Sequence, residues 1–287
     1  MIDLKLKRIL TSALVAATFF MTGCTSVGVN TAPQNADLTV IMYHSFLKDT
    51  SKSGKYIVTP SQFENDVIYL KNIGCSFVSV NDIQNFRQGK GSLPEKAVLI
   101  TIDDGNCNNY SYIYPLLKKY NIPALISPIC YWVEKYTENG DTNPLYAIMT
   151  KDNIREMHNS GLVEFGNHSY NLHSTSGRFG TCKMPDESAE SYRKMLYEDL
   201  KKADDIITEA TGEKPCALVY PYGMISPESY EVANELGYNI LFSCTEGINR
   251  IHAGDDRYLL KRYNRPAGID SSQYFSKIFT TGNNLLK

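Results

Sequence analysis

The segment AVLITIDDG, residues 97–105, is an apolar run that ends in two acids and a glycine, and it predicts a buried β-strand. Two adjacent carboxylates at the end of such a strand are costly to bury unless they are paired or bind a metal ion. Because Gly105 lets the chain turn at once, one of Asp103 and Asp104 can bind a metal while the other stays free as a base. The alternative is a solvated Asp-Asp-Gly turn.

Short β-rich runs alternate with helical patterns along most of the chain. The predicted strands are Leu38–Tyr43, Phe77–Val80, Ala97–Asp103, Ala124–Cys130, Leu162–His168, Ala217–Tyr222, Asn239–Cys244 and, as a further candidate, Leu259–Tyr263. Helical patterns lie around residues 63–70 and 113–117 and over 187–211. This alternation predicts a parallel sheet, and about seven or eight such units suggest an α/β barrel with its working residues at the carboxyl ends of the strands. Two long loops are expected over that face, Tyr131–Leu145 and Ser174–Asp186.

A second predicted strand runs into the hexapeptide HSYNLH, residues 168–173. The chain has only five histidines, so two within one hexapeptide stand out. Their spacing fits neither one helical face nor one strand face, but a strand end followed by a loop lets both rings turn toward one point. Histidine and carboxylate are good ligands for Zn²⁺, and three protein ligands with open positions make a catalytic site. The alternative is two structural histidines.

A third predicted strand ends in YPYG, residues 220–223, where proline and glycine predict a tight turn. Its backbone N–H groups are placed to form half of an oxyanion hole, with a purely structural turn as the alternative. Together the three segments resemble the motifs of the polysaccharide deacetylase family, the group with the NodB homology domain. Residues 101–105 look like its first motif, usually T-F-D-D-G, and residues 168–173 look like its second, H-[ST]-x-x-H. The YPYG turn stands where R-x-P-[YF] is expected.

The resemblance covers roughly residues 38–270 and implies an α/β fold, a distorted (β/α)7-8 barrel of the NodB type. It implies one divalent metal ion held by Asp104, His168 and His173, with Asp103 as the base that takes a proton from water. We expect Zn²⁺, with Co²⁺, Ni²⁺, Mn²⁺ and Fe²⁺ as alternatives. The implied activity is hydrolysis of N-acetyl groups on an amino-sugar polysaccharide, with O-acetyl groups as the alternative.

The sequence departs from the family motifs in its histidine spacing, its third motif and its late Leu-x-His motif. The spacing is one residue longer than usual, Val219 replaces the arginine of the third motif, and the late motif is missing. The longer spacing, the YPYG turn and Met42-Tyr43-His44 resemble the branch that deacetylates poly-β-1,6-N-acetylglucosamine and related polymers. That branch implies that His44 is the general acid and that the backbone N–H of Tyr222 helps to hold the oxyanion. A structural histidine is the alternative for His44.

The missing arginine leaves Asp103 without a cation, although this residue must stay ionised beside Asp104. Adjacent carboxylates raise each other's pKa, and a guanidinium can hold the free one in a bidentate pair. Arg262 is the expected replacement, because the last strand of a closing barrel returns beside the first strands. Arg265 is the runner-up, and a surface position for Arg262 is the remaining alternative.

The first residues predict a secretion signal outside the fold. A positively charged start precedes an apolar run, residues 9–21, that is too short to span a bilayer comfortably. Residues 21–24, Met-Thr-Gly-Cys, resemble a bacterial lipobox. We therefore expect a lipoprotein signal peptide over 1–23, lipid on Cys24, a flexible tether over 24–37 and the catalytic domain over 38–287. The protein would then be anchored in the membrane on its extracytoplasmic side; an ordinary signal peptide is the alternative.

Bulk composition narrows the possible functions further. A hydrophobic share of 43% is typical of a globular chain, and a net charge of −2 argues against nucleic acid as a partner. We expect a monomer. The cysteines other than Cys24 form no CxxC pair, and we expect mostly free thiols.

Two other classes of protein compete with an enzyme as the function of this chain. One is a non-catalytic carbohydrate-binding lipoprotein on the same barrel. The other is a transporter's solute-binding lipoprotein, which would need two similar lobes.

Overall fold

A computed structural model describes residues 34–284 of the chain, and side chains as far as Phe279. The predicted signal peptide and Cys24 lie outside these residues. Within them, no helix combines the length and the apolar character that crossing a membrane requires.

The central strand is β5 (Ala97–Asp104), which is the AVLITIDDG segment without its final glycine. It lies between β1 (Asn35–Tyr43) and β6 (Ala124–Pro128), and β7 (Val163–Phe165) follows β6; all four strands are parallel. The short β4 (Ser76–Phe77) pairs with the first residues of β5. On the other side, β10 (Asn249–His252) runs antiparallel to β1.

A second sheet completes the ring of strands. It consists of β8 (Ala217–Val219), β9 (Ile240–Phe242) and β11 (Tyr258–Leu260). A parallel bridge between Asn167 and Leu218 joins β7 to β8, and β12 (Tyr263–Asn264), which follows β11 closely, pairs with β1. The order is therefore β1–β5–β6–β7–β8–β9–β11/β12 and back to β1, which confirms the predicted distorted α/β barrel.

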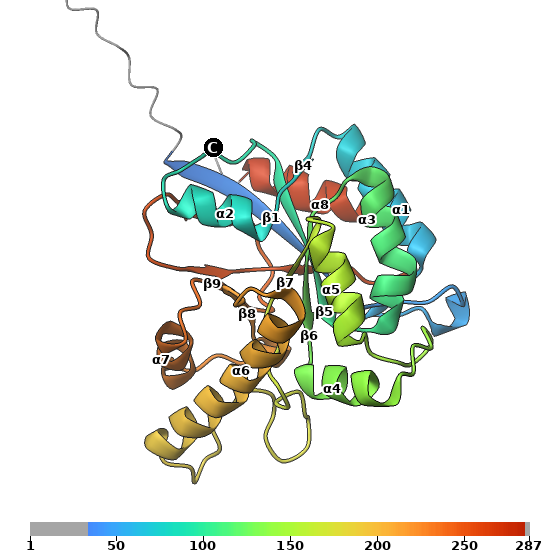
Figure 1. Ribbon diagram of the computed structural model, residues 1–287. Coiled ribbons are helices and arrows are strands. Elements are labelled where there is room, and N and C mark those ends of the chain that lie inside the picture. Colours follow the sequence, from blue (N-terminus) through green and yellow to red (C-terminus); the bar gives the residue numbers. More distant parts are fainter. Residues whose placement is uncertain (1–33, 285–287) are drawn as a thin grey trace, which may run out of the picture. The chain divides into compact units, whose positions relative to one another are not determined.

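Helices surround the strands, and Figure 1 shows α1 and α8 side by side on one flank of the central sheet. The helices are α1 (Pro60–Asn72), α2 (Val80–Arg87), α3 (Tyr114–Tyr120), α4 (Cys130–Asn139), α5 (Lys151–Asn159), α6 (Ala189–Thr211), α7 (Pro227–Glu235) and α8 (Ser271–Asn284). Ser or Thr side chains accept a backbone N–H at the starts of α1, α2, α5, α6 and α7, which is the usual way for a sequence to begin a helix. The remaining pieces are β2 (Ser45–Phe46), β3 (Ile57–Val58), the 3-10 turns η1 (Thr50–Lys52) and η3 (Pro221–Gly223), and the π-turn η2 (Asn109–Ile113).

Strand alternation divides the core into two layers. Val98, Ile100 and Ile102 of β5 pack outward against helices, whereas Ala97 and Leu99 face the barrel interior, together with residues of β1, β8, β9 and β11. The same alternation points Asp103 toward the interior. The end of β5 that carries Asp103 and Asp104 therefore lies above a barrel interior filled with apolar side chains.

The predicted loop Tyr131–Leu145 is wrong in its first half, because α4 occupies Cys130–Asn139. Cys130 and Val133 are buried at helical spacing, and Gly140 ends the helix at φ 70°. The predicted loop Ser174–Asp186 does lack helices and strands.

Several strand boundaries also differ from those predicted. Strand β1 starts at Asn35, inside the predicted tether, because residues 35–38 pair with β10. The predicted strand Leu259–Tyr263 is divided into β11 and β12, with Arg262 between them.

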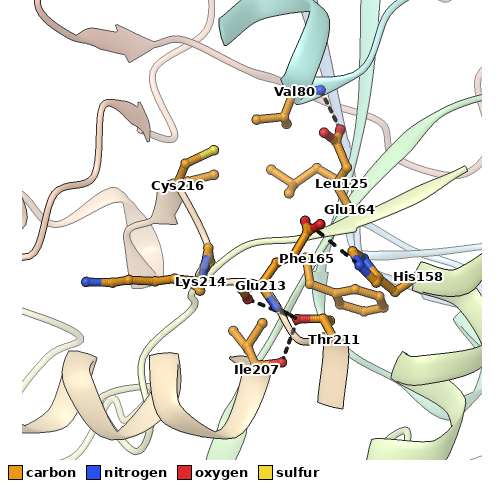
Figure 2. Close-up of a pocket in the computed structure, with 12 residues that line it drawn as sticks. Val80, Leu125, His158, Glu164, Phe165, Ile207, Thr211, Glu213, Lys214 and Cys216 are labelled. Carbon is orange, nitrogen blue, oxygen red and sulfur yellow. Dashed lines mark hydrogen bonds and ion pairs between the residues drawn. The ribbon is translucent and has the colours of Figure 1, made fainter. Parts of the chain in front are cut away.

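A small pocket lies at the amino-terminal edge of the barrel, between the start of β8 and the last turns of α5 and α6. Figure 2 shows the Glu164 carboxylate of β7 at the backbone of Val80. Its oxygens accept the N–H groups of Val80 and Asn81, at 2.5 and 2.8 Å, where α2 begins. Burial raises the pKa of Glu164 to about 7, despite these two donors.

Candidate active site

The residues singled out in the sequence meet at the carboxyl-terminal edge of the barrel. Each of them follows or ends a strand of the ring. His44 follows β1, Asp103 and Asp104 end β5, His168 comes shortly after β7, Tyr222 after β8, and Arg262 directly between β11 and β12. Parallel strands place their carboxyl ends at one edge, so side chains that are far apart in the sequence become neighbours.

Asp104, His168 and His173 form a candidate metal site. The Nε2 atoms of His168 and His173 lie 3.7 and 3.4 Å from Oδ1 of Asp104, and one ligand atom from each residue lies within 4.8 Å of the others. Oδ1 of Asp104 is buried without a hydrogen-bond partner. A buried carboxylate oxygen is rarely left unpaired, and one carboxylate with two imidazoles suits a divalent ion. The residues therefore fit the ion that the sequence predicts.

The turn after β5 directs Asp104 to this site. Asp104 and Gly105 have φ values of 70° and 76°. A Cβ atom at Gly105 would lie 2.5 Å from Cβ of Pro128, so the position admits only glycine without rearrangement. Because the chain turns here, adjacent acids serve different neighbours, with Asp103 inside the barrel and Asp104 beside the histidines.

Both histidines are oriented through their second ring nitrogen. Nδ1 of His168 lies 2.7 Å from the carbonyl oxygen of Val219, and Nδ1 of His173 lies 3.1 Å from the hydroxyl of Tyr222. Such contacts fix a ring and leave Nε2 toward the metal position. Burial lowers the pKa of His168 to about 3 and also lowers the pKa of His173. Both rings are thus held in the neutral form that binds metal.

Asp103 is paired with Arg262. Nη1 of Arg262 donates to Oδ1 of Asp103 at 2.8 Å, and its Nε donates to the carbonyl oxygen of Ser243 at 2.9 Å. Both side chains are almost fully buried, at 0% and 3% exposure. Burial by itself would raise the pKa of Asp103, but Arg262, His168 and His44 together outweigh it and hold this pKa at about 2. On the other oxygen, Nε2 of His44 lies 4.0 Å from Oδ2.

The runner-up Arg265 is engaged elsewhere. Its Nε and Nη2 donate to the two oxygens of Asp66, each at 2.9 Å, and both side chains are fully buried. Tyr43 and Ser271 donate to the same carboxylate. The geometry therefore gives the place beside Asp103 to Arg262 and leaves Arg265 a structural ion pair.

Aromatic rings flank the site on both sides. The exposed Tyr56 lies 4.7 Å from the ring of His44, and the exposed Phe179 stacks on Tyr222 at 4.7 Å, which in turn lies 4.5 Å from His173. Phe179 belongs to the long loop over the site. That loop approaches so closely that a Cβ at Gly180 would lie 2.8 Å from the carbonyl oxygen of Pro221. Sequence reasoning did not select Phe179, because Tyr and Phe together are too numerous to sort without a fold.

Comparison with known proteins agrees with this barrel and its arrangement of acids and histidines. The model of one family, described as polysaccharide deacetylase, matches residues 90–241, more than half of the chain. The chain therefore belongs to the polysaccharide deacetylase family. The matched residues include Asp103, Asp104, His168, His173 and Tyr222, whereas His44 and Arg262 lie outside them.

Relatives from two bacteria carry the same name. The chain is 29% identical over 231 residues to the poly-β-1,6-N-acetyl-D-glucosamine N-deacetylase of Staphylococcus aureus strain MSSA476, covering 76% of each protein. It is 27% identical over 229 residues to the Escherichia coli K12 protein of the same name, covering 72% of this chain and 34% of that one.

Solved structures agree. The de-N-acetylase from Aggregatibacter actinomycetemcomitans has 29% identity and a TM-score of 0.70, covering 86% of this chain and 99% of the other. IcaB from Ammonifex degensii has 26% identity and a TM-score of 0.68, covering 81% of this chain and 93% of the other.

Proposed function

We propose that this protein removes N-acetyl groups from an amino-sugar polysaccharide of the poly-β-1,6-N-acetylglucosamine type, with the help of one divalent ion. The observation that carries the proposal is the separation of the two acids: Asp103 is held by Arg262, while Asp104 faces two neutral histidines. One acid is thus kept free and ionised beside a site for a metal. The names of the relatives support the substrate class.

A divalent ion on Asp104, His168 and His173 would supply Lewis acidity to the acetyl carbonyl and to the attacking water. The ligand set favours Zn²⁺, with Co²⁺, Ni²⁺, Mn²⁺ and Fe²⁺ as alternatives that metal analysis would separate. Asp103 takes the proton of the water, because Arg262 keeps its carboxylate ionised and it is not one of the expected metal ligands. The backbone N–H of Tyr222 is proposed to donate to the oxygen that gains charge.

His44 completes the proton transfer. Burial lowers its pKa, so the ring starts neutral and must gain a proton before it can give one away. The nearest acid after water attack is protonated Asp103, whose Oδ2 lies 4.0 Å from Nε2 of His44. The proton then passes from water to Asp103, to His44 and to the leaving nitrogen. The carbon–nitrogen bond breaks, and the products are a free amine and acetic acid, which loses its proton to give acetate.

Location and assembly state belong to the same proposal. We propose that lipid on Cys24 holds a monomeric enzyme at the extracytoplasmic face of the membrane, where polysaccharide is accessible. The basis for the lipid anchor is the sequence of residues 1–24.

The decisive experiment is acetate release by the purified protein. Poly-β-1,6-N-acetylglucosamine should release acetate, chelator should abolish the release, and Zn²⁺ or Co²⁺ should restore it. An O-acetylated glycan without N-acetyl groups should release far less. Variants His168→Ala and His173→Ala should lose the bound ion in elemental analysis. Glycan binding without acetate release, with full metal occupancy, would instead support the carbohydrate-binding lipoprotein.

A further inference from the structure

The loop that carries both metal-binding histidines is held by a carboxylate of α6. Oδ1 of Asp199 accepts the backbone N–H of Tyr170 at 2.8 Å, and Oδ2 accepts the N–H of Asn171 at 2.9 Å. One side chain thus fixes two consecutive peptide groups midway between His168 and His173. Asp199 itself contacts neither histidine in any recorded hydrogen bond or ion pair of the described residues.

The opposite edge of the loop is held by the first residues of α4. The N–H of Cys130 donates to the carbonyl oxygen of Ser169 at 3.2 Å, and the N–H of Tyr131 donates to that of Tyr170 at 2.9 Å. The loop is therefore clamped between donors from α4 and an acceptor from α6. Its peptide groups have little freedom to rotate while both clamps hold.

The loop needs such support because its own sequence does not determine its path. Six residues with histidines at both ends fit no regular element, and Ser169 has φ 70°. Local bonds within the loop run from the N–H of Ser169 to Asn167 and from the N–H of Leu172 to Ser169. These local bonds do not involve the N–H groups of Tyr170 and Asn171, which donate to an acceptor outside the loop.

We propose that Asp199 is a positioning residue of the metal centre, whose carboxylate sets the loop so that His173 meets Asp104 and His168. The proposal rests on the proposed metal-dependent function. Helix α6 keeps its place without it, because Leu196, Leu200 and Ala203 are fully buried. Loss of the carboxylate should therefore loosen the ligand geometry more than the fold. Partners outside the ligand shell typically cost about 10–100-fold in metal affinity when removed.

The test uses Co²⁺ bound to the full-length protein. In Asp199→Asn the amide keeps the shape of the side chain but turns an NH₂ group toward one N–H donor, so one of the two bonds is lost. Asp199→Ala removes both. The control is Asp205→Asn on the same helix, an exposed acid paired with Lys201 at 2.6 Å. The measurements are the Co²⁺ absorption spectrum, the dissociation constant, the release rate into chelator and the melting temperature of the metal-free protein.

We expect Asp199→Asn to weaken Co²⁺ binding by about 10–100-fold through faster release and to alter the spectrum. The metal-free protein should melt close to wild type, and Asp205→Asn should match wild type throughout. Wild-type affinity and spectrum in Asp199→Asn would overturn the proposal. An affinity loss that only parallels a lowered melting temperature would overturn it too, because the role would then be structural. Wild-type protein that binds no Co²⁺ would reject the metal centre itself. If Asp199→Ala does not fold, the Asn variant decides.

Discussion

Arg262 donates a hydrogen bond of 2.8 Å to Asp103, although the two residues are 159 positions apart in the chain. The pair forms at the seam where the last strands of the ring return to β1, and β1 lies beside β5. We propose that this guanidinium does the work of the arginine that the family motif has at the position of Val219. Val219 instead contributes its carbonyl oxygen, which orients His168.

Replacing Arg262 should move the pH dependence of the reaction. Without the cation, burial is left to raise the pKa of Asp103 from about 2, so the base becomes protonated at higher pH. In Arg262→Ala the acidic limb of the kcat/KM profile should therefore shift upward and the rate should fall. Arg262→Lys should restore only part of the lost rate, because lysine supplies the charge but lacks the planar fork of the guanidinium. The exposed Arg250, paired with Asp37, offers the control Arg250→Ala. An unchanged pH profile in Arg262→Ala would exclude the proposed role.

Asp103→Asn should keep the ion and lose most of the rate. General-base contributions are worth roughly 10²–10⁴-fold, and an amide cannot take the proton of water. Elemental analysis together with acetate release separates binding from chemistry. If this variant arrives without metal, Asp103 is a ligand, and the two acids have shared or exchanged roles.

Phe179→Ala should affect long substrates more than short ones. The ring is 42% exposed and stacks on Tyr222, which lies beside His173, so a sugar face can lie flat against it. We expect KM for the polysaccharide to rise several-fold while a small acetyl ester is hydrolysed as before. The exposed Tyr230 of α7 supplies the control Tyr230→Ala. An equal loss of activity on both substrates would show that Phe179 stabilises the active site and does not bind the polysaccharide.

Glu164 should make the fold less stable as the pH rises. Its pKa is about 7 in the folded protein, against an ordinary value of 4.5, so the folded state binds the extra proton. The stabilisation is complete below pH 4.5 and is lost as the pH passes through 7. Glu164→Gln cannot titrate, so its stability relative to wild type should increase between these limits by up to about 1.4 kcal/mol per pH unit.

Chemical denaturation at several pH values measures this difference. Glu213→Gln is the control in the same pocket, because the side chain of Glu213 is 77% exposed. A constant difference between Glu164→Gln and wild type from pH 4.5 to 7 would show that folding does not raise the pKa of this carboxyl.

Cys24→Ser should release the protein from the membrane. The substitution removes the sulfur that would carry the lipid, and stable anchoring by lipoproteins depends on more than one acyl chain. Fractionation of cells, with metabolic labelling by a fatty acid, measures both effects. A serine variant as firmly membrane-bound as wild type would contradict lipid attachment at this residue.

The sequence was sufficient for the barrel and for the residues that meet at its edge. Long apolar strands such as residues 97–102 carry a clear pattern, and carboxyl ends of parallel strands converge by geometry. Helix α4 was missed because its few buried residues, Cys130 and Val133, lie among exposed polar and aromatic ones. Residues 35–37 look like a tether until β10 is known to lie beside them.

The supporting contacts of the site were beyond sequence reasoning for another reason. The carbonyl oxygen of Val219 belongs to the backbone, and because every residue has such an oxygen, no sequence pattern marks this one. Asp199 lies on a charged helix that carries several other acids, and only the fold shows which of them faces the histidine loop. The chemical roles of His44, Asp103, Tyr222 and Arg262 remain predictions, of which the variants of Asp103 and Arg262 test two.

The strands that bring Arg262 to Asp103 also divide the site along the chain. Asp104 and both histidines precede residue 174, whereas Arg262 lies between β11 and β12, the last strands of the described chain. A chain cut before β11 would therefore keep the residues of its metal site and lose the cation that pairs with its base. Ion binding and hydrolysis would be separated in such a fragment, because only closure of the barrel completes the pair.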